Sequence, residues 1–283
     1  MPSDHVLRAV SEDGAFRVIA ALTTQTVQGV VDAQHVRGPF AQRLADLVTA
    51  AVLVRETMSP DLRVQVILSD GRRTRFSADA MPAGVSRGLS QIGQGATPAI
   101  LDTMRHLTVM RSLHNGALQQ GQVLLEPGRS VADALMEYFR MSEQTASFVA
   151  IGSLFDGDTK VQSSAGYVVQ LLPEVTEEPL HMMTERLDRF EPIGKLLADA
   201  AAHPKKVLER LLEGVPHKQT AQTDLRFGCN CSQERVITSL ATLPPHDLAE
   251  LIAADEVLEI GCDYCGKQYK IAPESLKGLL SNN

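Results

Sequence analysis

The sequence predicts an α+β protein in three parts: an N-terminal domain of antiparallel sheets with packed helices, a helical linker, and a small C-terminal four-cysteine module. Three observations predict this class. Strand-like segments recur in pairs through residues 1–175, helical periodicity without strand signals dominates residues 176–223, and all four cysteines lie in residues 224–283. These three ranges are the domains that we expect.

The first domain is expected to contain an early strand and a helix. Strand-favouring residues cluster from Phe16 to Thr24. Gly38-Pro39 then opens a helix, because proline is favoured in the first helical turn. Apolar residues follow at helical spacing, which predicts that one face of this helix is buried: Phe40, Leu44, Leu47, Val48, Ala51 and Val54.

Three hairpins follow along the chain. In each, two strand-like segments flank a turn that contains glycine with asparagine or aspartate, the usual signature of a strand reversal. A helix from Ser130 to Met141 separates the second hairpin from the third. Strands that pair with their sequence neighbours indicate antiparallel sheets. The paired segments are 62–68 with 73–78, 107–113 with 119–125, and 148–155 with 161–172.

The linker is expected to consist of three helical pieces separated by Pro192 and Pro204. The pieces span Glu178 to Phe190, Ile193 to Ala202 and Lys205 to Leu212. Apolar residues at helical spacing in the first two pieces form stripes that must pack against another surface. Two interpretations stay open: a helical subdomain without further function, and an element that detaches.

The cysteines form two closely spaced pairs, Cys229-Asn-Cys231 and Cys262-Asp-Tyr-Cys265. Each pair closes a small chelate loop at little entropic cost, so folding has only one longer loop, residues 232–261, to close. Four thiolates suit a tetrahedral zinc ion with no open position, and the default role of such a site is structural. Their clustering is not that of a secreted disulfide scaffold.

The module is small, so metal binding is expected to supply much of its folding free energy, on the order of 10 kcal/mol. Its other elements are helices at Ser232 to Leu243, at Pro245 to Ala254 and from Pro273. An oxidant that converts the thiolates to disulfides, which cannot bind zinc, would unfold the module together with any element that leans on it. The linker is the obvious candidate for that element.

Composition excludes other classes of function. The 283 residues are 44% hydrophobic, too apolar for a disordered chain, and their net charge is −7. Nucleic acid and anionic membranes require a basic surface, so neither is an expected partner. The N-terminus lacks the pattern of a signal peptide and no apolar stretch is long enough for a bilayer, so the expected location is the cytoplasm.

The order of these parts resembles the redox-regulated 33-kDa heat-shock chaperone family, and the resemblance covers essentially the whole chain. Its most specific part is the cysteine pattern with Gly266 after it. Shorter segments support it: Val36-Arg37-Gly38, Tyr138-Phe139 with Ser142-Glu143-Gln144, and Ala165 to Pro173.

The resemblance implies a stress-response chaperone that is inactive as a reduced monomer with one Zn²⁺ per chain on Cys229, Cys231, Cys262 and Cys265. It implies that oxidation pairs Cys229 with Cys231 and Cys262 with Cys265. Zinc then leaves and the linker, residues 176–223, unfolds. The protein becomes an ATP-independent holdase, often a homodimer, whose first domain binds unfolded client proteins.

The expected function is therefore a cytoplasmic, oxidant-activated chaperone, and not an enzyme. No phosphate-binding loop and no spaced acid–base pair is evident in the sequence. One alternative is a constitutive zinc-ribbon interaction protein whose site never undergoes oxidation. Another is a thiol oxidoreductase that uses Cys262 and Cys265, which would need metal-free thiols of low pKa.

Overall fold

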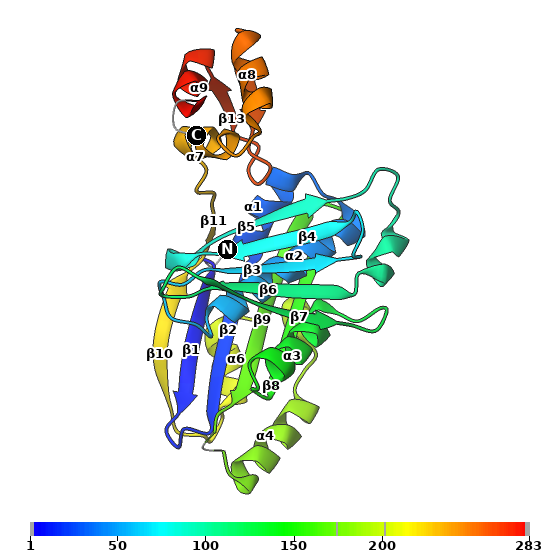
Figure 1. Cartoon of the computed structure of the whole chain (residues 1–283). Coiled ribbons are helices and arrows are strands. Elements are labelled where there is room, and N and C mark those ends of the chain that lie inside the picture. The colour runs from blue at the N-terminus through cyan, green and yellow to red at the C-terminus, as the bar shows by residue number, and fades with distance from the viewer. Residues whose placement is uncertain (1–2, 174, 201, 281–283) are drawn as a thin grey trace. The chain divides into compact units, whose positions relative to one another are not determined.

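The computed structural model describes residues 3–173, 175–200 and 202–280 (Figure 1). The chain divides into two compact units, the first ending at Phe227 and the second beginning at Gly228. No helix in the described ranges is long and apolar enough to cross a membrane.

The first unit contains a five-stranded antiparallel sheet in the order β10-β1-β2-β9-β8. Successive side chains in β1 and β2 point to opposite faces of the sheet, and each face packs on its own apolar core. Val6 and Ile19 belong to one core, whereas Leu7 and Val18 belong to the other. Strands β1 and β2 of this sheet are therefore buried on both faces. Its strands are β1 (His5–Ser11), β2 (Phe16–Leu22), β8 (Ser147–Asp156), β9 (Lys160–Leu171) and β10 (His217–Asp224).

A six-stranded sheet in the order β11-β5-β4-β3-β6-β7 completes the β-structure of this unit. All its pairs are antiparallel except β11 with β5. Two short 3-10 helices, Pro82–Gly84 and Pro98–Thr103, precede β5 and β6. The strands are β3 (Val64–Ser69), β4 (Arg75–Ala80), β5 (Val85–Gln91), β6 (His106–Ser112), β7 (Leu118–Leu124) and β11 (Arg226–Phe227).

Three helices, α1 (Thr24–Gln34), α2 (Gly38–Arg55) and α3 (Val131–Ser142), join the two sheets. Helix α2 contacts β3 and β4 of one sheet as well as β8 and β9 of the other. It therefore lies between the sheets, which explains why nearly every residue from Leu44 to Arg55 is buried. Helix α3 begins at a capping box between Ser130 and Asp133.

The outer face of the five-stranded sheet carries the predicted linker helices, α4 (Glu177–Arg189), α5 (Ile193–Ala198) and α6 (Pro204–Leu211). Helix α5 contacts β8 and β9, and α6 contacts β1 and β2. Met183, Leu196 and Leu211 are fully buried in the shared core. The apolar stripes of these helices thus cover the sheet.

The three predicted hairpins are confirmed as β3–β4, β6–β7 and β8–β9. The predicted early strand and proline-initiated helix are β2 and α2. One difference concerns the end of the predicted helical linker, residues 176–223. Its last predicted helical piece ends at Leu212, and His217–Asp224 forms strand β10, which the sequence analysis did not predict. This strand is polar and largely exposed, and backbone pairing with β1 holds it at the sheet edge, so its side chains carry no strand pattern.

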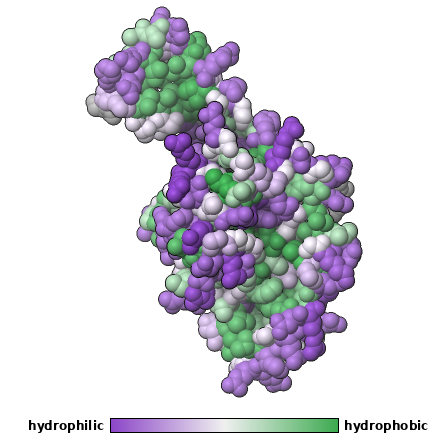
Figure 2. Space-filling model, turned by 90° about the vertical axis from the view of Figure 1, so that its right-hand side faces the viewer, coloured by the Kyte–Doolittle hydropathy of each residue, from purple (hydrophilic) through white to green (hydrophobic). Residues whose placement is uncertain are grey.

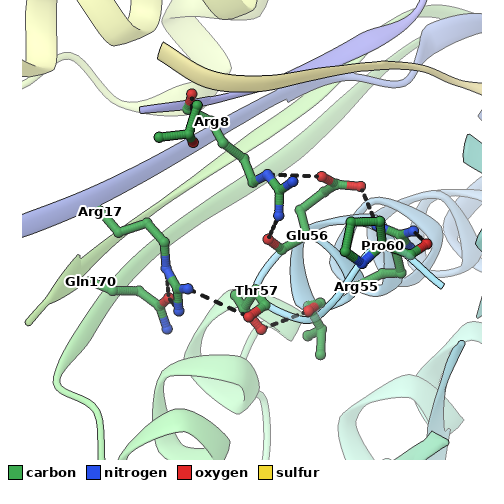
Figure 3. A network of polar contacts seen from close by, with 9 residues as sticks. Arg8, Arg17, Arg55, Glu56, Thr57, Pro60 and Gln170 are labelled. Atoms are coloured by element: carbon green, nitrogen blue, oxygen red, sulfur yellow. Dashed lines mark hydrogen bonds and ion pairs between the residues drawn. The ribbon is translucent and has the colours of Figure 1, made fainter. Parts of the chain in front are cut away.

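A polar network anchors the C-terminal end of α2 to the five-stranded sheet (Figure 3). Arg8 on β1 donates to the Glu56 carbonyl oxygen at 3.0 Å, and Arg55 donates to the Glu56 carboxylate at 3.0 Å. Arg17 on β2 donates to Gln170 on β9 at 2.9 Å. Burial raises the pKa of Glu56, although the two arginines beside it oppose this shift.

Asp46 on α2 ends a chain of hydroxyl groups in the first unit. Its carboxylate accepts a hydrogen bond of 2.9 Å from Ser153, which is 2.9 Å from the hydroxyl of Ser164. Burial raises the pKa of Asp46 to about 6, although Ser153 and the charge of Arg43 lower it. The ionised carboxylate therefore destabilises the fold.

We expect Asp46→Asn to stabilise the first unit at pH 8 by about 2 kcal/mol, because the amide keeps an acceptor for Ser153 without the buried charge. The folded-state pKa exceeds the unfolded value of 3.8, so this cost is fully present above about pH 6 and disappears as the pH falls toward 4. Urea unfolding of the parent protein and of Asp46→Asn at pH 8 and at pH 4 measures the difference in unfolding free energy. An equal difference in unfolding free energy at the two pH values would contradict this prediction.

The second unit is small. It contains α7 (Gln233–Leu240), α8 (Pro245–Ala253), β12 (Leu258–Gly261), β13 (Gln268–Ile271) and α9 (Pro273–Leu280), with β12 and β13 antiparallel. Its described core contains only a few buried residues, Leu248, Tyr269, Ile271 and Leu276. Figure 2 shows apolar side chains at the surface of this unit, and Val257 is 55% exposed. Such a core supplies little folding free energy by itself.

Candidate metal centre

The structure brings the four predicted cysteines together in the second unit. Cys229 and Cys231 precede α7, and Cys262 and Cys265 lie in the loop between β12 and β13. The four sulfur atoms all lie within 4.8 Å of one another. Elsewhere in the described ranges, no group of three or more histidine, cysteine or acidic side chains comes together in this way.

The loop that carries Cys262 and Cys265 is held by its own backbone. The N–H groups of Cys265 and Gly266 donate to the Cys262 carbonyl oxygen at 3.3 and 2.8 Å, and the Cys262 N–H donates to the Lys267 carbonyl oxygen at 2.9 Å. Gly266 has a φ of +71°, a left-handed conformation that glycine adopts without strain. The sequence Cys-Asp-Tyr-Cys-Gly therefore folds locally into a turn that points both sulfur atoms to one side.

The other cysteine pair is fixed by the start of α7. Ser232 is the N-cap of this helix and accepts a hydrogen bond of 3.3 Å from the Arg235 N–H. The Arg235 side chain donates back to the Asn230 carbonyl oxygen at 2.9 Å. The residues on both sides of Cys231 are thus held against the helix.

The distances between sulfur atoms fit a tetrahedral metal ion. Cys229 Sγ lies 3.7 Å from Cys262 Sγ, and Cys231 Sγ lies 3.5 Å from Cys265 Sγ. Four sulfur atoms at about 2.3 Å from one ion would be about 3.8 Å apart. The four thiols can therefore hold a metal ion with little rearrangement.

The thiols differ in their ionisation. Burial raises the pKa of Cys231, but hydrogen bonds from Tyr269 and from the other three cysteines outweigh it and lower the pKa to about 7. Burial raises the pKa of Cys262, and that of Cys265 to about 12. A metal must displace protons from these thiols, so affinity for the metal should rise with pH.

Tyr269 is a residue of the site that the sequence analysis missed. Its hydroxyl group donates to Cys231 Sγ at 3.0 Å. The available signal was its place in the strand directly after the Cys262–Cys265 loop, where an inward-facing residue lies beside the sulfur atoms.

Comparisons with known proteins agree with these observations. A family model described as Hsp33 protein matches residues 4–272. The chain is 30% identical to the 33 kDa chaperonin of Syntrophotalea carbinolica, over 98% of this chain and 99% of the relative. It is 29% identical to the 33 kDa chaperonin of Agathobacter rectalis over 98% and 99% of the two chains.

A crystal structure of the 33 kDa chaperonin from Thermotoga maritima has the same fold. The TM-score is 0.82 at 21% sequence identity, and the match covers 99% of each chain. The mixed α+β architecture with antiparallel sheets is therefore shared with a solved structure.

Proposed function

The chain belongs to the Hsp33 family, a family of chaperones, and from this premise we propose that it is an ATP-independent holdase that oxidation activates. The observation that carries the proposal is the cluster of four sulfur atoms within 4.8 Å in a unit with a very small core. Such a cluster can couple a chemical signal, thiol oxidation, to the folding of a segment. The clients would be unfolding proteins.

The ion held in the reduced state would be one Zn²⁺, with Cys229, Cys231, Cys262 and Cys265 as ligands. The donor set is all sulfur and its distances are tetrahedral, the combination that zinc occupies in structural sites. Zinc supplies the free energy that keeps the small unit folded. The cytoplasm, where thiols stay reduced, is the compartment in which this state would persist.

Oxidation would pair Cys229 with Cys231 and Cys262 with Cys265, as the family resemblance implies. Each disulfide consumes two thiolates, one hydrogen peroxide and two protons and yields two water molecules. Two disulfides leave no thiolate to bind zinc, so the ion is released. The second unit then loses its main source of stability.

The surface that becomes available would lie under α4, α5 and α6. These helices cover apolar residues of the five-stranded sheet, and an aromatic pair and a cation–π contact add to this packing. Phe190 packs edge-on against Tyr167 with 5.5 Å between ring centroids, and Arg210 lies 4.9 Å above the Phe190 ring. Release of the helices would expose a continuous apolar face, the kind of surface that an unfolded chain binds.

We expect only the oxidised form of the protein, and not the reduced form, to suppress the aggregation of a thermally unfolding client. Light scattering of the client is measured in the presence of the reduced, zinc-loaded protein. It is measured again in the presence of the protein that has been treated with peroxide at elevated temperature. Analytical ultracentrifugation of both forms tests the expected change from monomer to homodimer. A protein that keeps its zinc through peroxide treatment and suppresses aggregation in neither state would instead be a zinc-ribbon protein with a structural site.

A further inference from the structure

The hydroxyl group of Tyr269 lies against one sulfur atom of the cysteine cluster. It donates a hydrogen bond of 3.0 Å to Cys231 Sγ, and only 6% of Tyr269 is exposed. Tyr269 pairs with Ile260 in the two-stranded sheet β12–β13, which also frames the loop of Cys262 and Cys265. The Lys267 ammonium group lies 5.2 Å from the centroid of the tyrosine ring. These contacts surround the ring, and its hydroxyl group points at the sulfur atom.

Two of the other sulfur atoms receive hydrogen bonds from the backbone. The N–H groups of Tyr264 and Cys265 donate to Cys262, and the N–H group of Lys267 donates to Cys265. Such donors are backbone groups that the fold of the loop sets, and only a substitution by proline would remove one. The donor to Cys231 is a side chain, so the residue type at position 269 decides whether this thiolate is hydrogen-bonded.

We propose that Tyr269 restrains the reaction of Cys231 with oxidants and thereby sets the oxidant level at which the metal centre opens; this inference rests on the proposed function. A metal-bound cysteine is already a thiolate, so a hydrogen bond cannot increase its ionisation. The hydrogen bond instead withdraws electron density from the lone pair that attacks the oxidant.

The restrained step is the first attack on peroxide. The Cys231 lone pair forms a bond to one peroxide oxygen, the O–O bond breaks, and the departing hydroxide takes a proton to become water. The resulting sulfenic acid reacts with a neighbouring thiolate and one further proton to give a disulfide and a second water molecule. The hydrogen bond from Tyr269 stabilises the thiolate before the attack more than the sulfenic acid after it, and so slows the first step.

The test is Tyr269→Phe in the full-length, reduced, zinc-loaded protein. Phenylalanine keeps the buried ring and removes only the hydroxyl group. We expect peroxide to release zinc about three- to tenfold faster than from the parent, followed with a chromogenic chelator. Tyr138→Phe is the matched control, because it removes a tyrosine hydroxyl that donates to Glu143 in the first unit. Its zinc release should occur at the parental rate.

A spectroscopic measurement separates electronic restraint from a structural role. With Co²⁺ as the probe metal, the sulfur-to-metal charge-transfer band of Tyr269→Phe should move to lower energy, because the Cys231 sulfur becomes a stronger electron donor. Equal zinc-release rates and an unmoved band would overturn the inference and leave the redox switch intact. A variant that cannot bind one zinc when reduced would also overturn it, since the hydroxyl would then hold the fold together. If the parent releases no zinc under peroxide, the proposed function fails and the inference fails with it.

Discussion

Simultaneous replacement of Cys262 and Cys265 by serine is expected to unfold residues 228–283 of the reduced protein and to leave the first unit folded. The second unit has a core of few buried residues, so without its metal it loses on the order of 10 kcal/mol of folding free energy. Bound zinc should fall from one per chain to near zero. Hydrogen exchange followed by mass spectrometry should show the amides of β12 and β13 exchanging as in an unfolded chain.

Val257→Ser is the matched control for this experiment. Val257 lies in the same unit and is 55% exposed, so its replacement removes apolar area without touching the core or the sulfur atoms. This variant should retain zinc and slow exchange. Protected amides in β12 and β13 of the double cysteine variant would show that the apolar core alone folds the unit, and the metal would then lose its role as the source of stability.

Leu196→Asp is expected to make the protein an active holdase without any oxidant. Leu196 on α5 is fully buried against the five-stranded sheet. An aspartate there leaves a cavity and buries an unpaired carboxylate, a destabilisation of about 4 kcal/mol or more. This cost exceeds the free energy that the packing of a six-residue helix supplies. Helix α5 should therefore leave the sheet while the zinc centre stays reduced. Client light scattering under reducing conditions measures the activity, and zinc content shows that the metal centre is unchanged.

The control for this variant is Leu180→Asp on α4. Leu180 belongs to the same helical segment but is 38% exposed, so a charge there remains hydrated. It should keep the reduced protein inactive. If Leu196→Asp unfolds the whole first unit, Leu196→Ala serves as a milder second variant. It leaves a smaller defect under α5 and should give intermediate holdase activity. Inactivity of both Leu196 variants, with α5 shown by hydrogen exchange to be released, would place client binding elsewhere on the molecule.

Local sequence signals were sufficient for much of this structure. The hairpins β3–β4, β6–β7 and β8–β9 follow from strand residues on both sides of a glycine-containing turn, because a tight turn dictates that its two strands pair. The helices of the predicted linker follow from apolar periodicity interrupted by prolines. Turn chemistry and helical spacing act within a few residues, so sequence alone exposes them.

Long-range pairing hid other elements. Strand β10 is a run of polar residues whose strand conformation comes from backbone hydrogen bonds to β1, more than 200 residues earlier in the chain. Helix α2 carries apolar residues around most of its circumference, and only its position between two sheets explains why. In both cases the segment pairs or packs with residues far away in the chain. The residue pattern of the segment itself does not identify those residues.

The same division holds for the cysteine cluster. By itself the sequence determined the set of candidate metal ligands, because two close cysteine pairs can converge on one ion in almost any fold that brings them together. The tertiary structure decided the 3.5 and 3.7 Å sulfur distances, the Tyr269 hydroxyl on Cys231, and the sheet face that α4 to α6 cover. These features depend on strand register and on side-chain packing between segments far apart in the chain, which residue spacing does not encode.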